Sequence, residues 1–291
     1  MDKLIYGFSK SKGISLIYAD VTEAAKSLEQ KHLSGPTASR FLGQALAVAS
    51  ILSADLGDKD ERVSIQVRVD GPIGGCVADA SREGNLRGYT QMKILNDFDE
   101  KPDTKISDVL GKAGQFTVIR SNSRMMLENE QLRCDPFNFN FALARYYNDR
   151  KRQPTAVEIV SKCHNFNIER AVGLKMSRMN EGISEDFVPL LEKFNDHSIE
   201  KALSLNVDIK TLANTLGLED LQIIESRPLT AKCTCSREKV LYSVSCLPAE
   251  ELQEILEKHE EPEVTCHFCS TTYHVTAPEV VAMLREKQEK K

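Results

Sequence analysis

Four cysteines form two close pairs near the end of the chain. The first pair lies in "KCTCS", as Cys233 and Cys235, and the second lies in "TCHFCS", as Cys266 and Cys269. Four thiolates in two such pairs suit the tetrahedral coordination of a structural Zn²⁺. The spacing therefore predicts one Zn²⁺ per chain, held by these four residues. A complete set of four thiolates leaves no open position, which argues against a hydrolytic zinc.

Other candidate ligands are less well placed by the sequence. Three histidines occur near the cysteine pairs, and we expect them to be surface residues because a set of four thiolates needs no fifth ligand: His259, His267 and His274. The remaining cysteines are scattered, and we expect them to be buried or incidental thiols: Cys76, Cys134, Cys163 and Cys246.

Two interpretations of the zinc site remain open at this point. Closed tetrathiolate sites usually only hold structure, which favours a plain structural module. The alternative is a switch, in which oxidation removes the thiolate ligands and the module unfolds. Cysteines one residue apart can form a disulfide only in a small, strained ring, and strained disulfides are readily reduced. The spacing of Cys233 and Cys235 is therefore compatible with a reversible switch.

Length and composition limit the class of protein. The chain has 291 residues, 41% hydrophobic residues and a net charge of −5. This length predicts one large domain and at least one small one. The longest apolar run, "LGQALAVASIL", is too short to span a bilayer, and the start of the chain shows no secretory signal. We therefore expect a cytoplasmic protein without a membrane partner, in which clustered cysteines bind metal or do redox chemistry.

The first part of the sequence mixes helix and strand signals. "GPTASRFLGQALAVASILSADLG" has a proline near its start, and its apolar residues surround most of the helix circumference, which predicts a buried helix. "ERVSIQVRVDG" alternates apolar and polar residues, as a half-buried strand does. "CVADA", "NLRGYT" and "GQFTVIR" follow as further strands. The sequence thus predicts an α+β fold with an N-terminal sheet-and-helix core domain over residues 1–182.

The later part of the sequence reads differently. Between 137 and 182 we predict mainly helix, with "FNFALARYYNDR" and "PTAVEIVSK" as the best segments. Residues 183–230 contain short amphipathic helices and predict a helical linker, whose apolar side chains either pack on the main domain or form a concealed binding surface. Residues 231–291 predict a small zinc-binding module, in which "CSREKVLYSVSC" and "VTCHFCSTTYHVT" form strands around the helix "PAEELQEILEKH".

The motifs "CTCSREKV" and "EVTCHFC", with the acidic helix between them, closely resemble the redox-regulated holdase chaperone family, heat-shock protein thirty-three. The resemblance continues in "LGLEDLQIIESRPL", "DGPIGGCVADASREGNLRGY" and "LGKAGQFTV". It implies a chaperone rather than an enzyme, with zinc bound in the reduced, inactive form. It also implies oxidation to disulfides between Cys233 and Cys235 and between Cys266 and Cys269, with release of the zinc.

The resemblance further implies what oxidation does to the rest of the molecule. The linker and the module at 231–291 unfold, the protein forms a homodimer, and apolar surface binds unfolding client proteins without ATP. Hand-over of clients to ATP-dependent foldase chaperones is a further expectation of this kind. The alternative is a structural zinc-module protein that mediates protein–protein interaction without a redox switch.

Two rival classes fit the sequence less well. A nucleic-acid-binding zinc ribbon needs a basic surface, but residues 231–291 hold eight Lys and Arg against eleven Asp and Glu, a net charge of −3. We therefore expect no nucleic-acid partner. A thioredoxin-like enzyme would place its CxxC at the start of a helix, whereas "TCHFCSTTYHV" continues into β-prone residues. Glycine-rich segments such as "GPIGG" also lack the spacing of a phosphate loop.

Overall fold

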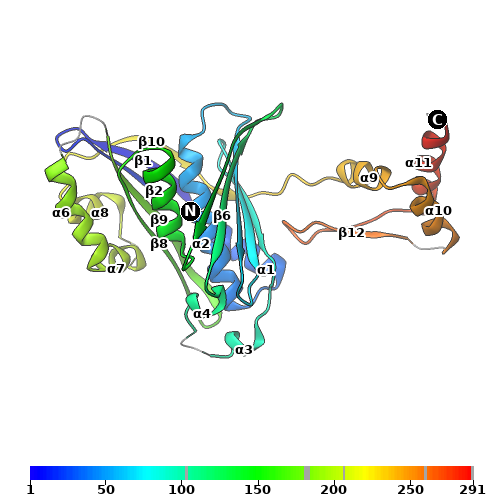
Figure 1. Cartoon of the computed structure of the whole chain (residues 1–291), viewed down its shortest axis with the longest axis horizontal. Helices are drawn as coiled ribbons and strands as arrows, with labels where there is room; N and C mark the ends of the chain where they lie inside the picture. The colour runs from blue at the N-terminus through cyan, green and yellow to red at the C-terminus, as the bar shows by residue number, and fades with distance from the viewer. Residues whose placement is uncertain (102–103, 180–183, 206, 259–260, 290–291) are drawn as a thin grey trace. The chain divides into compact units, whose positions relative to one another are not determined.

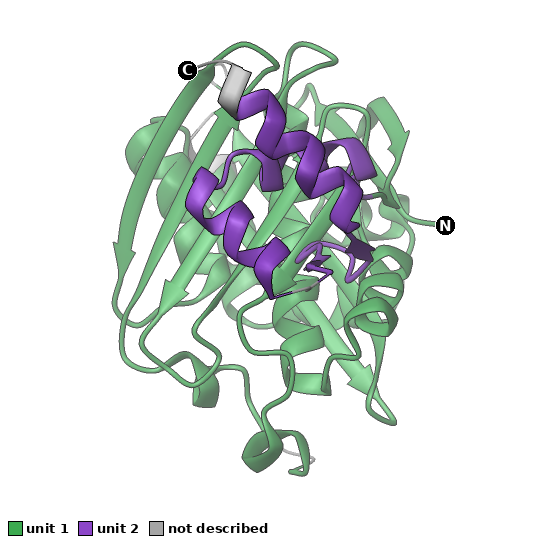
Figure 2. Ribbon diagram, turned by 90° about the vertical axis from the view of Figure 1, so that its right-hand side faces the viewer, with its two compact units in different colours: residues 1–232 green, residues 233–291 purple. Residues whose placement is uncertain are grey.

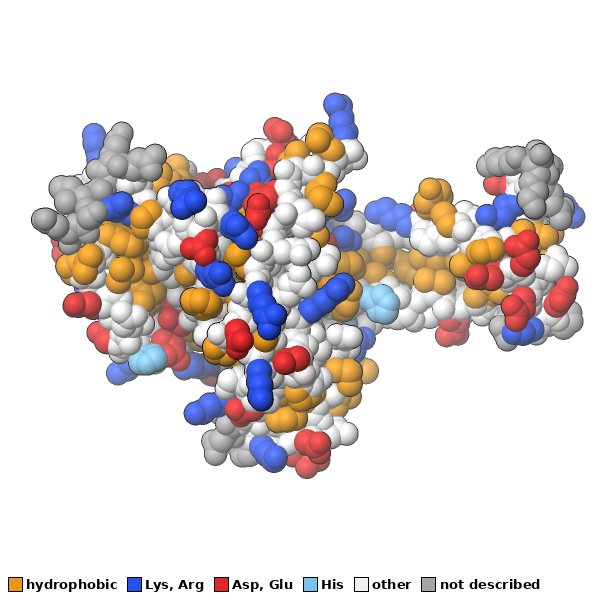
Figure 3. All heavy atoms as spheres, in the orientation of Figure 1, with side chains coloured by type: hydrophobic (Ala, Val, Ile, Leu, Met, Phe, Trp, Pro, Cys, Tyr) orange, Lys and Arg blue, Asp and Glu red, His pale blue; other side chains and the backbone are white. Residues whose placement is uncertain are grey.

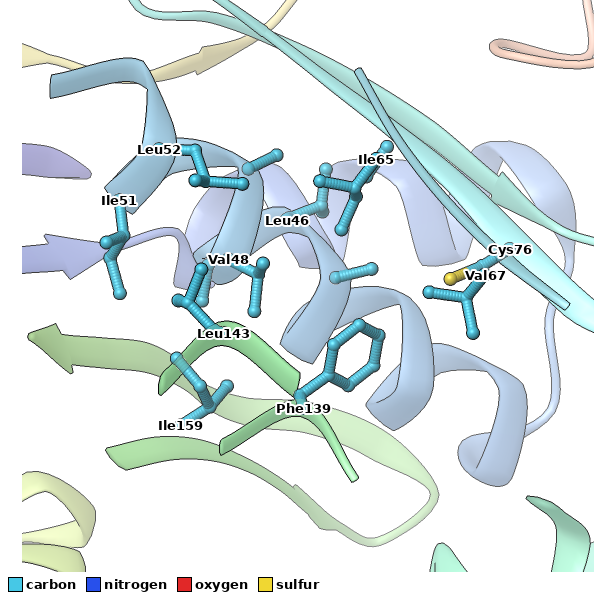
Figure 4. Packing of buried hydrophobic residues seen from close by; sticks show 14 of the residues in the cluster. Leu46, Val48, Ile51, Leu52, Ile65, Val67, Cys76, Phe139, Leu143 and Ile159 are labelled. Carbon is cyan, nitrogen blue, oxygen red and sulfur yellow. The ribbon is translucent and has the colours of Figure 1, made fainter. Parts of the chain in front are cut away.

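A long buried helix, α2 (Pro36–Leu52), lies between two β-sheets. Gly35 precedes it in an extended conformation, and Pro36 begins its first turn, where proline costs no hydrogen bond. Its apolar residues face both sheets, so Leu46, Val48 and Ile51 are fully buried (Figure 4). The prediction of a buried helix here is confirmed.

The computed structural model describes residues 1–101, 104–179, 184–205, 207–258 and 261–289. The chain divides into unit 1 (Met1–Lys232) and unit 2 (Cys233–Lys291), which Figure 2 distinguishes by colour. Both helices and sheets are present, as the predicted α+β class requires. Within the described ranges, no helix combines the length and apolar character needed to cross a membrane.

Unit 1 contains two antiparallel sheets, apart from one short parallel pairing. Sheet A has the order β10-β1-β2-β9-β8, with β1 (Lys3–Ser9), β2 (Ile14–Asp20), β8 (Thr155–His164), β9 (Asn167–Arg178) and β10 (Gln222–Pro228). Sheet B has the order β11-β5-β4-β3-β6-β7, with β3 (Arg62–Val69), β4 (Gly75–Ser81), β5 (Asn85–Thr90), β6 (Gly114–Ser121), β7 (Met126–Cys134) and β11 (Thr230–Ala231). Only β11 and β5 run parallel in the pairings of the described strands.

The helices of unit 1 are shorter than α2. They are α1 (Thr22–His32), the 3₁₀ turn η1 (Ser53–Asp55), α3 (Asn96–Asp99), α4 (Ser107–Leu110), α5 (Phe139–Arg145) with the π-helical turn η2 (Tyr146–Arg150), α6 (Ser184–Asn195), α7 (Ser198–Ser204) and α8 (Ile209–Thr215). Unit 2 contains α9 (Arg237–Ser245), α10 (Ala249–Glu257), the hairpin of β12 (Glu263–Thr265) and β13 (Thr272–His274), and α11 (Ala277–Glu289).

The main core of unit 1 fills the space between the sheets around α2. β3 contributes Val63, Ile65 and Val67 to it, as its alternating sequence predicted, and β8 contributes Val157 and Ile159 from sheet A. Because sheet A and sheet B each turn an apolar face toward the same helix, most of the buried apolar surface of unit 1 belongs to one continuous cluster.

The other face of sheet A is also apolar, and α6, α7 and α8 cover it (Figure 1). We call these three the linker helices. They contribute Phe187, Leu190, Ile199, Leu203 and Leu212 to a second buried cluster, whose sheet residues include Ile14, Leu16, Val160, Leu174 and Met176. The sequence left open whether the apolar side chains of residues 183–230 pack on the main domain or form a concealed binding surface. In this structure, those of the linker helices pack on sheet A. Figure 3 shows that hydrophobic side chains also remain on the outside of this layer.

Two predictions of helix after residue 137 need correction. "FNFALARYYNDR" is helical, but "PTAVEIVSK" lies in the hairpin of β8 and β9. The turn of this hairpin consists of Asn165 and Phe166, which both have positive φ. Two positive φ values are typical of a two-residue hairpin turn, and asparagine tolerates this conformation. The segment before the cysteines also ends as a strand, β10, which pairs with β1. Residues 184–205 and 207–232 thus fall within unit 1, and the linker role of 183–230 stays a prediction.

In unit 2, "REKVLYSVS" forms α9 and not the predicted strand. Ser236 caps this helix by accepting a hydrogen bond from the amide of Lys239. Val240 and Val244, four residues apart, lie on one face of the helix and join the core of unit 2. The helix spacing was present in the sequence but was hidden by the β-prone residues around it.

Candidate metal centre

The second cysteine pair lies in the turn of a short hairpin. β12 and β13 pair from Glu263 with His274 to Thr265 with Thr272, and the amide of Cys266 continues the pairing by donating to the carbonyl of Thr271 at 2.9 Å. The amides of Cys269 and Ser270 turn back to the carbonyl of Cys266. This tight turn brings the Sγ atoms of Cys266 and Cys269 close to each other. It requires a positive φ of 57° at Ser270, a conformation that favours glycine.

The first cysteine pair lies immediately before α9. Arg237, two residues after Cys235, donates to both carboxylate oxygens of Glu279 at 2.8 and 2.9 Å and to the carbonyl of His274 at 3.0 Å. These bonds tie the beginning of α9 to the end of β13 and the first turn of α11. This ion pair, in which one guanidinium nitrogen reaches both carboxylate oxygens, therefore helps to hold the loop of Cys235 beside the hairpin.

The four sulfur atoms come together as a compact group. All four Sγ atoms of Cys233, Cys235, Cys266 and Cys269 lie within 4.8 Å of one another. Sγ of Cys233 is 3.7 Å from that of Cys266, and Sγ of Cys235 is 3.4 Å from that of Cys269. A tetrahedron with Zn–S bonds of about 2.3 Å has edges of about 3.8 Å. The spacing thus fits a tetrathiolate Zn²⁺ site, and all four thiols are free of disulfide bonds.

Hydrogen bonds favour the thiolate form at two of these sulfurs. Tyr273 Oη lies 3.1 Å from Sγ of Cys235, and Thr271 Oγ1 lies 3.3 Å from Sγ of Cys269. Burial opposes ionisation of Cys269, but hydrogen bonds from Thr271 and from neighbouring thiols outweigh it and lower the pKa of Cys269 to about 7. Burial raises the pKa of Cys235, and the hydrogen bond from Tyr273 works against that rise. A thiolate near neutral pH is the form that binds a metal cation.

The scattered cysteines lie in different surroundings. Cys76 and Cys134 are buried in the core of unit 1, and Cys163 is half-buried, while Cys246 is exposed. Burial raises the pKa of Cys76 and Cys134, and it raises the pKa of Cys163 to about 12. The structure therefore places these three as unreactive neutral thiols.

Neither of the two described histidines nearby, His267 and His274, belongs to the group of four cysteines. His267 and His274 are exposed, and Nδ1 of His274 lies 3.3 Å from a carboxylate oxygen of Glu263. His259 lies outside the described residues. Among the His, Cys, Asp and Glu side chains that the structure describes, the four cysteines alone form a group able to hold a metal ion.

Unit 2 has a small apolar core to support this site. Its buried apolar side chains are those of Val240, Val244, Leu252, Val275 and Val280. Val240 and Val244 come from α9, Leu252 comes from α10, and the other two flank the start of α11. A core this small has little burial to offset the conformational entropy of folding. Ligand bonds to a metal would supply what the core lacks.

Comparison with known proteins places this chain in a family. A family model described as Hsp33 protein matches residues 2–276, nearly the whole chain. This chain belongs to the Hsp33 family. Members of this family are chaperones and not enzymes, so the predicted chaperone class and the absence of an enzymatic activity agree with the match.

Curated relatives and a solved structure agree with this Hsp33 assignment. The 33 kDa chaperonins of Geobacillus kaustophilus and Bacillus licheniformis are 26% and 25% identical, over 96% and 98% of this chain and 96% and 100% of their own. The crystal structure of the 33 kDa chaperonin of Thermotoga maritima, a heat shock protein 33 homolog, has a TM-score of 0.88 at 23% identity and covers 99% of both chains. At this identity the likeness shows the shared fold.

In this Hsp33 chain, residues that sequence reasoning missed hold the linker helices on sheet A. Arg170 of β9 is 7% exposed, and its guanidinium donates to the carbonyl of Leu203 at 3.2 Å, to Asp20 at 2.9 Å and to the hydroxyl of Tyr18 at 2.8 Å. It therefore fixes the end of α7 to two strands. The sequence of β9 shows that Arg170 is charged, but it does not indicate which carbonyl group Arg170 binds.

A second missed cluster holds β10. Arg82 makes a two-point contact with Glu225, and Arg227 donates to the carbonyl and hydroxyl of Ser53 at 2.6 and 2.8 Å. Arg227 also donates to the carbonyl of Arg82. β10 is thus fixed to the main core by charged hydrogen bonds, which are stronger than neutral ones.

Proposed function

We propose that this Hsp33 protein is a redox-regulated, ATP-independent holdase. Its reduced form is inactive and binds one Zn²⁺ through Cys233, Cys235, Cys266 and Cys269. Oxidation converts the four thiolates to disulfides and ends metal retention. Unit 2 and the linker helices then unfold and expose apolar surface that binds unfolding client proteins and prevents their aggregation.

The covered apolar face of sheet A is the observation that carries this proposal. The linker helices are short, and Ile199 and Leu203 of α7 belong to one buried cluster with strand residues such as Val160 and Leu174. Short helices of this kind are not stable alone, so their stability depends on the packing of one face. Their removal would expose a contiguous apolar surface, and such surfaces associate with other exposed apolar chains.

The redox chemistry balances with peroxide as the oxidant. One thiolate sulfur attacks a peroxide oxygen, an S–O bond forms, the O–O bond breaks, and the hydroxide that leaves is protonated by buffer acid to water. A second thiolate then attacks this sulfur, an S–S bond forms and the second oxygen leaves as water after protonation. As each disulfide forms, its two thiolates give up two electrons, which reduce one peroxide to two waters. The family resemblance favours the pairs Cys233–Cys235 and Cys266–Cys269.

Further parts of the proposal concern assembly and place. We infer three functional parts, with the chaperone core at 1–182, the linker at 183–230 and the redox module at 231–291. The oxidised protein forms a homodimer, because surface that recognises unfolded chains also recognises a second copy. It works in the cytoplasm and passes clients to ATP-dependent foldase chaperones.

Aggregation of a thermally unfolding test protein decides the proposal. Light scattering is followed with reduced protein, with peroxide-treated protein and with no addition, all without nucleotide. Oxidised protein should suppress scattering and bind more of an apolar dye than reduced protein does. If oxidised protein keeps its zinc, gains no dye binding and leaves aggregation unchanged, the redox proposal is wrong and a structural zinc module remains.

A further inference from the structure

Tyr273 is the residue of interest because its hydroxyl contacts a sulfur of the metal centre. It lies on β13, where the hairpin register sets it opposite Val264, and its ring packs against the apolar core of unit 2. Its Oη is 3.1 Å from Sγ of Cys235. A phenol can only donate to a thiolate, since a thiolate has no proton to give.

Neighbouring contacts hold Tyr273 and Cys235 in place relative to each other. The backbone of β13 continues into Val275, which is fully buried, and Thr272 of the same strand contacts the hydroxyl of Thr265 at 3.0 Å. On the other side, Arg237 holds the loop of Cys235 to the carbonyl of His274, the residue after Tyr273. Both partners of the O–H···S bond are thus anchored to the same strand.

Hydrogen bonds to a ligand sulfur change its reactivity. Residues that hydrogen-bond to the ligands of a metal centre orient these ligands and tune their electronic properties. Mutation of such a residue commonly changes the affinity or the activity of the centre. A donor that stabilises negative charge on sulfur lowers its basicity, and the nucleophilicity of a thiolate falls with its basicity. Cys235 with its phenol donor is therefore slower to attack peroxide than it would be without it.

We propose that Tyr273 is a positioning residue that restrains oxidation of the metal centre by donating a hydrogen bond to Cys235. This inference rests on the redox switch proposed above, and it concerns the sensitivity of that switch. The hydroxyl makes the reduced state resistant to low peroxide, so that the chaperone activates only under stronger oxidation.

The variant Tyr273→Phe tests this because it removes only the hydroxyl and keeps the packed ring. Tyr242→Phe is the matched control, since Tyr242 belongs to the same unit and is 72% exposed. Full-length reduced proteins are loaded with Zn²⁺, and zinc release under peroxide is followed with a chromogenic chelator. We expect one Zn²⁺ per chain in both variants and release that is about 2- to 10-fold faster in Tyr273→Phe alone, the size of effect one hydrogen bond can give.

A second measurement separates reactivity from loosened structure. Zinc extraction by a strong chelator without peroxide should proceed at the same rate in Tyr273→Phe as in the wild type. Equal acceleration with and without peroxide would mean that the hydroxyl only stabilises the fold, and the proposal would be overturned. Slower release under peroxide would overturn it too, because the phenol would then be assisting the attack.

Mass spectrometry of alkylated thiols completes the test. Early in the reaction, Cys235 should be oxidised in a larger fraction of Tyr273→Phe molecules than of wild-type molecules. If wild-type protein releases no zinc with peroxide, the redox proposal itself fails. If the wild type does release zinc and Tyr273→Phe behaves as Tyr242→Phe does, only the role of Tyr273 is rejected.

Discussion

Unit 1 buries most of α2 between two sheets, whereas unit 2 buries five apolar side chains in its core and carries a group of four thiols. In unit 1, stability comes from apolar area removed from water, which changes little with redox conditions. In unit 2, the core is too small to do this alone, and the thiols offer a second source of stability that depends on their oxidation state. The comparison teaches that the four thiols, which we propose as the redox sensor, lie in the part of the chain that burial stabilises least.

Removal of a metal ligand should have the largest effect. It should unfold unit 2 and loosen the linker helices, and it should leave the main core of unit 1 folded. Cys266→Ser breaks the tetrathiolate set, and structural zinc contributes about 10–16 kcal/mol to the folding of small modules. We expect loss of zinc by metal analysis and rapid hydrogen exchange throughout α9 to α11. Cys246→Ser, a change at an exposed thiol, should keep both. Full zinc in Cys266→Ser would reject the ligand assignment, and a chelator that melted the whole chain in one transition would reject the contrast between the units.

A cavity in the main core should affect unit 1 alone. Leu46 of α2 is fully buried, so Leu46→Ala should lower the free energy of unfolding of unit 1 by about 2–5 kcal/mol. Urea unfolding followed by circular dichroism measures this, and zinc retention should be unchanged. Leu33→Ala, the same change at a residue that is 79% exposed, should cost far less. Loss of zinc from Leu46→Ala would show that the two units do not fold independently.

The linker helices give an intermediate case. Arg170→Gln removes the hydrogen bonds that hold the end of α7, and bonds from a charged group contribute about 1.5–3 kcal/mol. Reduced protein should then show faster hydrogen exchange in the linker helices and more apolar dye binding, with zinc still bound. Arg62→Gln, at an exposed contact with Ser121, serves as control. Faster exchange confined to β9 would contradict the role of Arg170 as the attachment of α7.

The pH dependence of stability should report on the contact between the linker helices and sheet A. Glu158 lies on β8 between Ala156 and Val160, which face the linker helices. Burial raises its pKa from 4.5 to about 7, although a hydrogen bond from Asn140 opposes the rise. The pKa of Glu158 is higher in the folded than in the unfolded protein, so the protonated carboxyl group stabilises the fold. This stabilisation is complete at a pH below the unfolded pKa of 4.5, and it is lost as the pH rises through about 7.

Glu158→Gln cannot ionise and should therefore remove this part of the pH dependence. At pH 8 it should be more stable than the wild type by on the order of 1 kcal/mol, a value reduced for partial exposure. Thermal melts between pH 5 and pH 8 measure the difference. A variant whose melting temperature falls with pH as steeply as that of the wild type would show that Glu158 does not carry the effect.

The smallest effect is expected at the turn of the second cysteine pair. Ser270 has a φ of 57°, and Ser270→Gly should stabilise unit 2 by about 0.5–1 kcal/mol, because relief of a left-handed penalty of about 1–2 kcal/mol exceeds the entropy cost of glycine. Zinc affinity in a competition with a chelator should rise slightly. Ser245→Gly, at the end of α9, should not raise it. A loss of affinity in Ser270→Gly would show that the serine side chain has a role of its own.

The sequence predicted the features that depend on local pattern. The grouping of the four thiols follows from cysteine spacing, α2 follows from its all-round apolar character, and β3 follows from strict alternation. "PTAVEIVSK" was assigned to helix because its apolar residues fit either period, and only pairing with β9 decides for strand. β10 could not be predicted, because its partner β1 lies more than two hundred positions earlier in the chain. Tyr273 was missed for a similar reason, since its sulfur contact depends on how two separate segments meet.

The pairing of β2 with β9 has a consequence for how the protein is made. β2 ends at Asp20, but its partner strand ends at Arg178. At about 5–20 residues per second, a ribosome needs roughly 10–30 s to synthesise the intervening chain. Throughout that time Ile14, Leu16 and Tyr18 have no completed sheet to join, while sheet B can form from neighbouring hairpins. This member of a chaperone family is thus itself exposed to aggregation while it is a nascent chain.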